Sequence, residues 1–233
     1  LIPPMANSAK AAKLVCDPDK RRAARVLTQA EVPVGANFSG VDLRCGDYSN
    51  IRFEDVNLQG ASLDGAKVRV LKNVNADGAS FVGATVGEPG RYVVSGSFRN
   101  ANLSNAILFI NSDSNEVVNF DRANLTGAQI VSPARVSMVG ANLSKSRIRF
   151  GFKDSDLSKA NLQGVDVMGA TFERTLFVGS NFGGGRLARA KFLQCDLTKA
   201  KFIGAMIQGA DFFGSITAGA NFSKAKGKAF GLG

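Results

Sequence analysis

The sequence contains no histidine and no tryptophan, and only three of its 233 residues are cysteine. Without histidine there is no Ser-His-Asp triad, no imidazole metal ligand and no imidazole proton shuttle. The cysteines are too far apart for a Cys-x-x-Cys zinc site, and no pair of carboxylates has a spacing that suggests acid–base catalysis. The sequence therefore predicts that the protein is not an enzyme and binds no cofactor, metal ion or small-molecule substrate.

Long apolar runs are also missing, since no stretch approaches eighteen consecutive apolar residues, and the sequence predicts no transmembrane helix. The first residues, Leu1 to Met5, have no charged region, apolar core or cleavage site of a signal peptide. We therefore expect a cytoplasmic protein. Cys16 and Cys45 would meet only if the N-terminal segment folds over the start of the repeat described below. Free thiols in a reducing cytosol are the favoured interpretation, and Cys195 fits a small inward position.

The feature that is present is a period of five. From Phe152 to Phe222 every fifth residue is large and apolar, with Thr217 as the exception. This period matches neither the 3.6 residues of a helical turn nor the two-residue alternation of a strand. It requires a chain that turns a corner every five residues and points one large side chain inward on each face.

Several five-residue units have nearly the same sequence. They are Ala36–Gly40 (ANFSG), Ala123–Gly127 (ANLTG), Ala160–Gly164 (ANLQG) and Ala220–Lys224 (ANFSK). The sequence resembles the pentapeptide-repeat family, whose unit is A(D/N)LXX with Leu or Phe at the centre. The resemblance implies an all-β solenoid, a right-handed quadrilateral β-helix with four units per coil. About 190 residues at twenty per coil predict nine to ten coils, stacked ~4.8 Å apart.

We expect three parts: residues 1–34 as an N-terminal cap, 35–227 as the β-helix and 228–233 as a C-terminal tail. A short α-helical cap is predicted within residues 6–31. Asp17 would be its N-cap and Pro18 its first helical residue, and it would cover the open end of the first coil.

The period is regular from Phe38 to Val68 and then slips several times before Phe152. The slips predict bulges or loops at residues 73–77, 87–96, 111–117 and 132–140. Loops on a rigid scaffold are natural recognition elements, but bulges in imperfect repeats are also common without any function. The candidate recognition residues are Glu88, Pro89, Arg91, Asp113, Asn115 and Arg135.

The net charge of +10 is uneven: +3 over residues 1–35, −1 over 36–139 and +8 over 140–233. A candidate basic surface comprises Arg174, Arg186, Arg189, Lys191, Lys199, Lys201 and Lys224. It is either an ordinary solvated face or an electrostatic footprint for an acidic protein, a nucleic acid or an anionic membrane. The aromatic side chains are expected to point inward, which weakens the nucleic-acid option.

Apolar residues near the C-terminus stand where the repeat normally has polar ones. The candidate dimer interface comprises Leu193, Ile203, Met206, Phe213, Ile216 and Phe230. We expect a homodimer through these coils, or alternatively a tail that folds back over the same side chains.

The sequence thus predicts a non-enzymatic interaction scaffold, a rigid rod that binds a protein partner through loops and charged faces. Some members of the family resemble a DNA duplex in size and charge and bind DNA gyrase, a topoisomerase, which suggests a topoisomerase-protection protein as one alternative. Direct mimicry needs a negative rod and is disfavoured by the basic C-terminal half, whereas a loop-mediated gyrase contact stays open. The other alternative is a basic surface that binds nucleic acid or anionic lipid.

Overall fold

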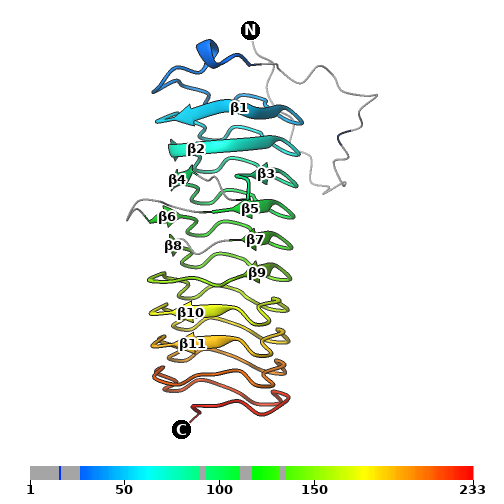
Figure 1. The fold of residues 1–233 in the computed structure, drawn as a ribbon, viewed down its shortest axis with the longest axis vertical. Helices are drawn as coiled ribbons and strands as arrows, with labels where there is room; N and C mark the ends of the chain where they lie inside the picture. Colours follow the sequence, from blue (N-terminus) through cyan, green and yellow to red (C-terminus); the bar gives the residue numbers. More distant parts are fainter. Residues whose placement is uncertain (1–15, 17–26, 90–92, 111–116, 132–134, 233) are drawn as a thin grey trace.

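The structure, a computed structural model, describes residues 16, 27–89, 93–110, 117–131 and 135–232. The chain winds into a parallel β-solenoid whose coils stack along one axis, with β1 (Asp47–Glu54) near one end and the coils after β11 (Lys191–Leu193) at the other (Figure 1). Each neighbouring pair of strands is parallel, because each strand bonds to the equivalent segment one coil away. The predicted solenoid is confirmed.

The strands are short because the chain turns a corner every few residues. A nine-stranded sheet contains β1 (Asp47–Glu54), β2 (Lys67–Asn75), β3 (Thr85–Val86), β4 (Val93–Ser97), β5 (Ile107–Phe109), β6 (Val118–Asn119), β7 (Gln129–Val131), β8 (Val136–Ser137) and β9 (Arg147–Arg149). A second sheet pairs β10 (Thr171–Glu173) with β11 (Lys191–Leu193). The helix of the described residues is a single 3₁₀ turn, η1 (Gln29–Glu31).

Three faces of the rod are marked by ladders of parallel bridges, each with ten residues. The first face has Asn37, Asn57, Asn75, Ser97, Asn119, Ser137, Asp156, Leu176, Asp196 and Ile216. The second has Asp42, Ser62, Ser80, Asn102, Asn124, Asn142, Asn161, Asn181, Lys201 and Asn221. The third has Asp47, Lys67, Thr85, Ile107, Gln129, Arg147, Asp166, Arg186, Met206 and Lys226. The segment from a third-face ladder residue to the next first-face one, called the fourth-face segment, contains the third-face unit and the fourth face that follows it.

Coil length varies on one face. In every coil the steps from first to second face and from second to third are five residues each. The fourth-face segment is ten residues from Asp47 to Asn57, eight from 67 to 75, and twelve from 85 to 97 and from 107 to 119. It is eight from 129 to 137, nine from 147 to 156, and ten in the remaining coils. The slips of the period therefore lie in the fourth-face segments.

The core is one continuous axial stack of the residues that follow the ladder positions. In the regular C-terminal coils the phenylalanines of successive coils lie face to face, with ring centroids 4.9 Å apart for Phe182 and Phe202 and 4.6 Å apart for Phe202 and Phe222. These distances match the spacing of hydrogen-bonded strands, so one coil rise places one ring on the next.

Most of the predicted cap helix lies outside the described residues. Its described end is the 3₁₀ turn η1, preceded by Thr28, whose backbone N–H donates to Glu31 Oε2 at 2.8 Å. Leu27 and Val32 on either side of this turn are buried and join the axial core. This part of the chain therefore covers the first coil with a turn and two apolar side chains, where an α-helix was expected.

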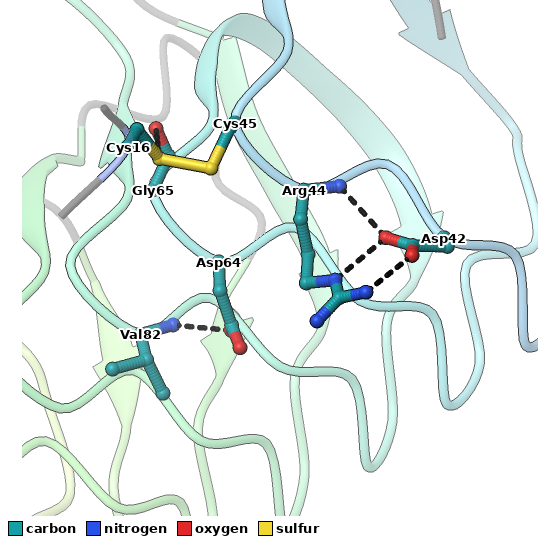
Figure 2. The surroundings of a disulfide bond; sticks show 7 residues. All are labelled: Cys16, Asp42, Arg44, Cys45, Asp64, Gly65 and Val82. Atoms are coloured by element: carbon teal, nitrogen blue, oxygen red, sulfur yellow. Dashed lines mark hydrogen bonds and ion pairs between the residues drawn. A yellow bond between two sulfur atoms is a disulfide. The ribbon is translucent and has the colours of Figure 1, made fainter. Parts of the chain in front are cut away.

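Cys16 and Cys45 form a disulfide, with Cα atoms 5.7 Å apart (Figure 2). Cys45 occupies a corner after the second face, and Gly65 occupies the same corner one coil on. A Cβ atom on Gly65 would lie 2.4 Å from Cys16 Sγ, so this glycine leaves the space that the disulfide fills. The free-thiol interpretation was wrong for this pair. Disulfides are rare in cytosolic proteins, so the bond also weighs against the cytoplasmic prediction.

Cys195 is free and buried, in the inward position expected for it. Within the described parts of the chain, no helix has the length and apolar character needed to cross a membrane.

Candidate interaction surfaces

The fourth face brings the irregular segments of the sequence together. The described residues of the ranges 73–77, 87–96, 111–117 and 132–140 overlap the fourth-face segments of successive coils. The first of them is a bulge within β2: Asn73 has φ 51° at a register shift between Leu71 and Val74. Sequence reasoning found the breaks but not their common face.

A shallow depression of about 480 Å³ lies where the fourth face turns into the first. It is lined by Asn73, Val74, Asn75, Gly96, Ser97 and Val117. The Asn73 N–H donates to Ser95 Oγ at 2.8 Å, and its side-chain amide donates to Asp55 Oδ1 at 2.6 Å. The bulge is therefore held by hydrogen bonds to both neighbouring coils.

Three of the six predicted recognition residues are described. Glu88 forms an ion pair with Arg69, with 3.8 Å between Oε1 and Nη1, and Pro89 beside it is exposed. Arg135 is half-buried just before β8. Arg91, Asp113 and Asn115 lie outside the described residues.

The predicted basic residues do not share one face. Arg186 and Arg189 lie on the third face, Arg174 and Lys191 on the fourth, Lys199 on the first, and Lys201 and Lys224 on the second. Arg174 is also paired: its Nε lies 2.7 Å from Asp154 Oδ1, and it forms a second ion pair with Glu173. The hydrogen bond from Arg174 lowers the pKa of the Asp154 carboxyl. The set therefore contributes separate charges on all sides of the rod.

A basic cluster that the sequence analysis did not identify lies on the third face. Arg147, Asp166 and Arg186 occupy three successive ladder positions, and Asp166 Oδ2 lies 3.5 Å from Arg147 Nε and 3.4 Å from Arg186 Nη1. Arg149 stands two residues beyond Arg147, and Met168 two residues beyond Asp166. These residues and Ile148 line a depression of about 260 Å³. One carboxylate thus pairs with two arginines, and the third arginine, Arg149, lines the same depression.

The second face has the opposite character. Its middle ladder residues are asparagines, and side-chain amides donate between coils, from Asn124 to Asn102 at 3.1 Å and from Asn161 to Asn142 at 3.2 Å. Each side-chain oxygen also accepts from the backbone N–H two residues later, as in Asn161 with Gln163 at 3.2 Å. Because these side-chain amides bond to one another between coils, the asparagines stabilise the stacking of the coils.

A family model described as "Pentapeptide repeats" matches the sequence in eight copies, over residues 34–69, 152–174 and 175–214. The chain contains pentapeptide repeats over these residues. The matched residues lie in the regular coils at the two ends, and the coils with unequal fourth-face segments fall between them.

Solved structures of other pentapeptide-repeat proteins are similar at low sequence identity. HetL, involved in heterocyst differentiation regulation in the cyanobacterium Nostoc sp. strain PCC 7120, is 20% identical, with 83% of this chain and 84% of that chain covered and a TM-score of 0.28. A trypsin-treated point variant of QnrB1, a plasmid-mediated fluoroquinolone resistance protein, is 16% identical, with 84% and 90% covered and a TM-score of 0.37. A thylakoid-lumen protein of Arabidopsis thaliana is 22% identical, with 62% and 72% covered and a TM-score of 0.15. None of the curated proteins compared with the sequence matches it.

The C-terminal coils of this pentapeptide-repeat protein carry the exposed apolar residues that the sequence predicted. Phe213 is 64% exposed, Phe230 58% and Ile216 57%, whereas Leu193 in β11 is half-buried. Ile203 and Met206 are exposed one coil earlier, on the second and third faces. The six residues therefore surround the last coils and do not form a stripe on one face.

One exposed aromatic side chain was missed. Phe150 is 72% exposed and follows Arg149 at a corner of the third face. The expectation that the aromatics point inward was wrong at this position. The signal was available, since Phe150 is one of the few phenylalanines outside the five-residue period.

Proposed function

We propose that this pentapeptide-repeat protein is a non-enzymatic scaffold that binds a protein partner through its fourth face. The observation that carries the proposal is that three faces keep five-residue steps in every coil while the fourth varies between eight and twelve residues. A regular frame with variation confined to one face is the arrangement of a scaffold that presents recognition segments.

The chemistry of the described surfaces supports binding over catalysis. The described residues contain no group of three His, Cys, Asp or Glu side chains that could hold a metal ion. Carboxylates near arginines, such as Asp77 beside Arg99 at 2.8 Å, are used in ion pairs along the rod. The depressions at the bulge and at Asp166 are shallow and lie on the outer surface.

A segment transplant tests the proposal. Residues 107–118, a twelve-residue fourth-face segment with its ladder residue, are replaced by the regular residues 186–195. Proteins retained from native lysate by the wild-type rod and by the variant are compared after nuclease treatment. We expect one specific protein on the wild type and its loss from the variant, with the thermal unfolding transition preserved.

The matched control alters a constant face. Exchanging the second-face unit 124–128 (NLTGA) for 161–165 (NLQGV) keeps both length and pattern, so partner retention should not change. Equal loss in both variants, or equal retention in both, would contradict binding through the fourth face.

We also propose a homodimer through the C-terminal coils. Phe213, Ile216 and Phe230 are more than half exposed around the last coil, and burying such side chains against a second copy is favourable. Phe213→Asp is expected to convert a dimer to a monomer in light-scattering mass measurements. An unchanged dimer mass in that variant would contradict the interface.

Topoisomerase protection by charge mimicry is not favoured by the surface. The third face is basic, and carboxylates on the other faces pair with cations, as Asp42 does with Arg44 and Glu54 with Arg52. A DNA-like rod needs an excess of negative charge, so gyrase remains only one candidate for the partner of the fourth face.

A further inference from the structure

Phe150 has an unusual backbone conformation for its side chain. Its φ is 68°, in the left-handed region that bulky residues rarely adopt. The other non-glycine residues with positive φ in the described chain are Asn, Asp, Lys, Arg, Gln or Cys. Its carbonyl accepts a 2.9 Å hydrogen bond from Thr171 N–H of the next coil, which holds this corner in place. An exposed ring fixed at a disfavoured φ is a feature that often accompanies a binding site.

The residues beside this ring are cationic and only partly neutralised. Arg147 and Arg186 share the carboxylate of Asp166, and Arg149, next to Phe150, has no ion pair in the described chain. The third face as a whole carries many more cations than carboxylates. Its cations are Lys67, Arg69, Arg147, Arg149, Arg186, Arg189, Lys226 and Lys228, against the carboxylates of Asp47, Glu88 and Asp166.

The positive charge continues along the axis. Below Arg186 the same face presents Arg189 at the corner and then Lys226 and Lys228 two coils further on. At ~4.8 Å per coil, the cations from Arg147 to Lys226 extend over about 19 Å. A linear polyanion fits this row better than a compact ligand, because the depression at Asp166 is open and holds only about 260 Å³.

We propose that the third face binds single-stranded nucleic acid, with phosphates on Arg147, Arg149 and Arg186 and a base stacked on the Phe150 ring. Guanidinium groups pair well with phosphates, and an aromatic ring among cations is the combination that single-strand binding proteins use. A bilayer fits less well, because the large exposed apolar side chains of this row, Phe150, Met168 and Met206, stand singly among the cations, whereas Phe213, Ile216 and Phe230 gather around the last coil. Arg147, Arg149 and Phe150 lie at the third-face end of the segment from 147 to 156, which the exchange of residues 107–118 leaves unchanged, so the two proposals are tested separately.

The test uses a fluorescein-labelled, mixed-sequence 20-nucleotide DNA single strand and measures fluorescence anisotropy at 50 and 200 mM salt. With three phosphate contacts, log K should fall against log salt with a slope of about −2, which is roughly a 20-fold loss of affinity over this range. The same sequence as a duplex should bind more weakly, since its bases are not available for stacking.

Two variants separate the two contributions. Arg149→Ala should make the salt slope less steep by about 0.7. Phe150→Asn, which tolerates the left-handed φ, should weaken binding about 5- to 150-fold with the slope unchanged, and Phe150→Tyr should restore affinity. The control Lys201→Ala removes a cation from the equivalent ladder position of the second face and should bind as wild type.

Three outcomes would overturn the proposal. One is the absence of oligonucleotide binding at 50 mM salt. Another is wild-type affinity in both Arg149→Ala and Phe150→Asn, with circular dichroism showing folded protein. The third is equal binding of duplex and single strand together with binding to phosphatidylserine vesicles that Phe150→Asn abolishes, which would assign the face to a membrane surface.

Discussion

The N-terminal and C-terminal halves of the rod solve the same packing problem with different regularity. From Phe152 onward each coil has twenty residues, and phenylalanines stack in columns, as Phe172, Phe192 and Phe212 do at 5.1 and 5.0 Å. Before Phe152 the coils have 18, 20 or 22 residues for most turns, yet Phe98 and Phe120 still stack at 5.0 Å across a 22-residue coil.

The difference teaches that axial stacking does not require constant coil length. It requires that the inequalities occur in the segment whose strand pairing admits register shifts, as between Tyr48 and Arg52 and between Leu71 and Val74. Two five-residue steps keep three faces aligned, so the fourth-face segment can lengthen or shorten without moving the aromatic centres. The N-terminal half also has the Cys16–Cys45 disulfide, whereas the C-terminal half relies on its aromatic columns.

Deleting two residues should have the largest effect, and the effect should depend on the face. Removing Gln163 and Gly164 shortens a second-face step that is five residues in every coil, so the ladder loses its register with both neighbours. We expect loss of the cooperative unfolding transition. Removing Glu173 and Arg174 makes a fourth-face segment of eight residues, as found from 67 to 75, and should cost a few kcal/mol at most.

Urea unfolding followed by circular dichroism distinguishes the two deletions. If both variants unfold alike, the fourth face is not special and the comparison between the halves fails.

Truncating a central ring should cost more in the C-terminal half. Phe192 packs against Phe172, Phe177, Phe182, Phe202 and Phe212. Phe192→Ala should lower the free energy of unfolding by about 3–5 kcal/mol, through lost burial and the cavity left behind.

The matched variant is Phe98→Ala, since Phe98 is also fully buried but its ring neighbours are Phe81 and Phe120. Its loss should be smaller, because fewer aromatic pairs are removed. A larger loss at Phe98, measured by the same urea titration, would reverse the proposed ranking.

Reducing the disulfide should destabilise the N-terminal coils. The bond joins residues 29 apart, and releasing a loop of this length from the unfolded chain costs about 3–4 kcal/mol in the chain-entropy account. We expect dithiothreitol to lower the thermal transition of the wild type. It should leave Cys45→Ser unchanged, and a shift in that variant would assign the effect to another cause.

Cys195 should give a smaller, pH-dependent effect. Burial raises the pKa of its thiol from 9.0 to about 11. The folded protein thus holds this proton between pH 9 and 11 while the unfolded chain releases it, so stability falls as pH rises through this window. The loss is about 2–3 kcal/mol.

Cys195→Ala, compared with wild type at each pH, isolates this contribution, because the other titrating groups are common to both proteins. The difference in unfolding free energy should change between pH 9 and 11 and stay constant below pH 8. A constant difference throughout would contradict the raised pKa.

The solenoid and its inward residues could be predicted from the sequence because each coil repeats the same local requirement. The common face of the irregular segments could not be predicted while Ala76 and Met138 were left uncounted as inward centres, although both are fully buried and complete the first-face series. When these two residues are counted, the inward centres of the first, second and third faces are five residues apart in every coil. Each slip then falls between the third-face centre of one coil and the first-face centre of the next. A small alanine at a centre is invisible to a search for large apolar residues.

Side-chain placement beyond the repeat was harder to predict. The disulfide depends on where residue 16 lies in space, which no period specifies. The basic cluster on the third face needs coil lengths of 19 and 20 residues to be known before Arg147, Asp166 and Arg186 can be aligned. The exposed direction of Phe150 follows from a left-handed corner that the five-residue pattern does not encode.

The ladders that hold three faces in step also set a scale for recognition. Two groups at equivalent positions of one face are separated along the axis by a whole number of coil rises, ~4.8 Å each. A change of two residues in a fourth-face segment alters how far that segment can reach sideways, but not the level at which it leaves the rod. Binding groups on one face therefore recur at this fixed spacing, and a partner that contacts two coils must match it.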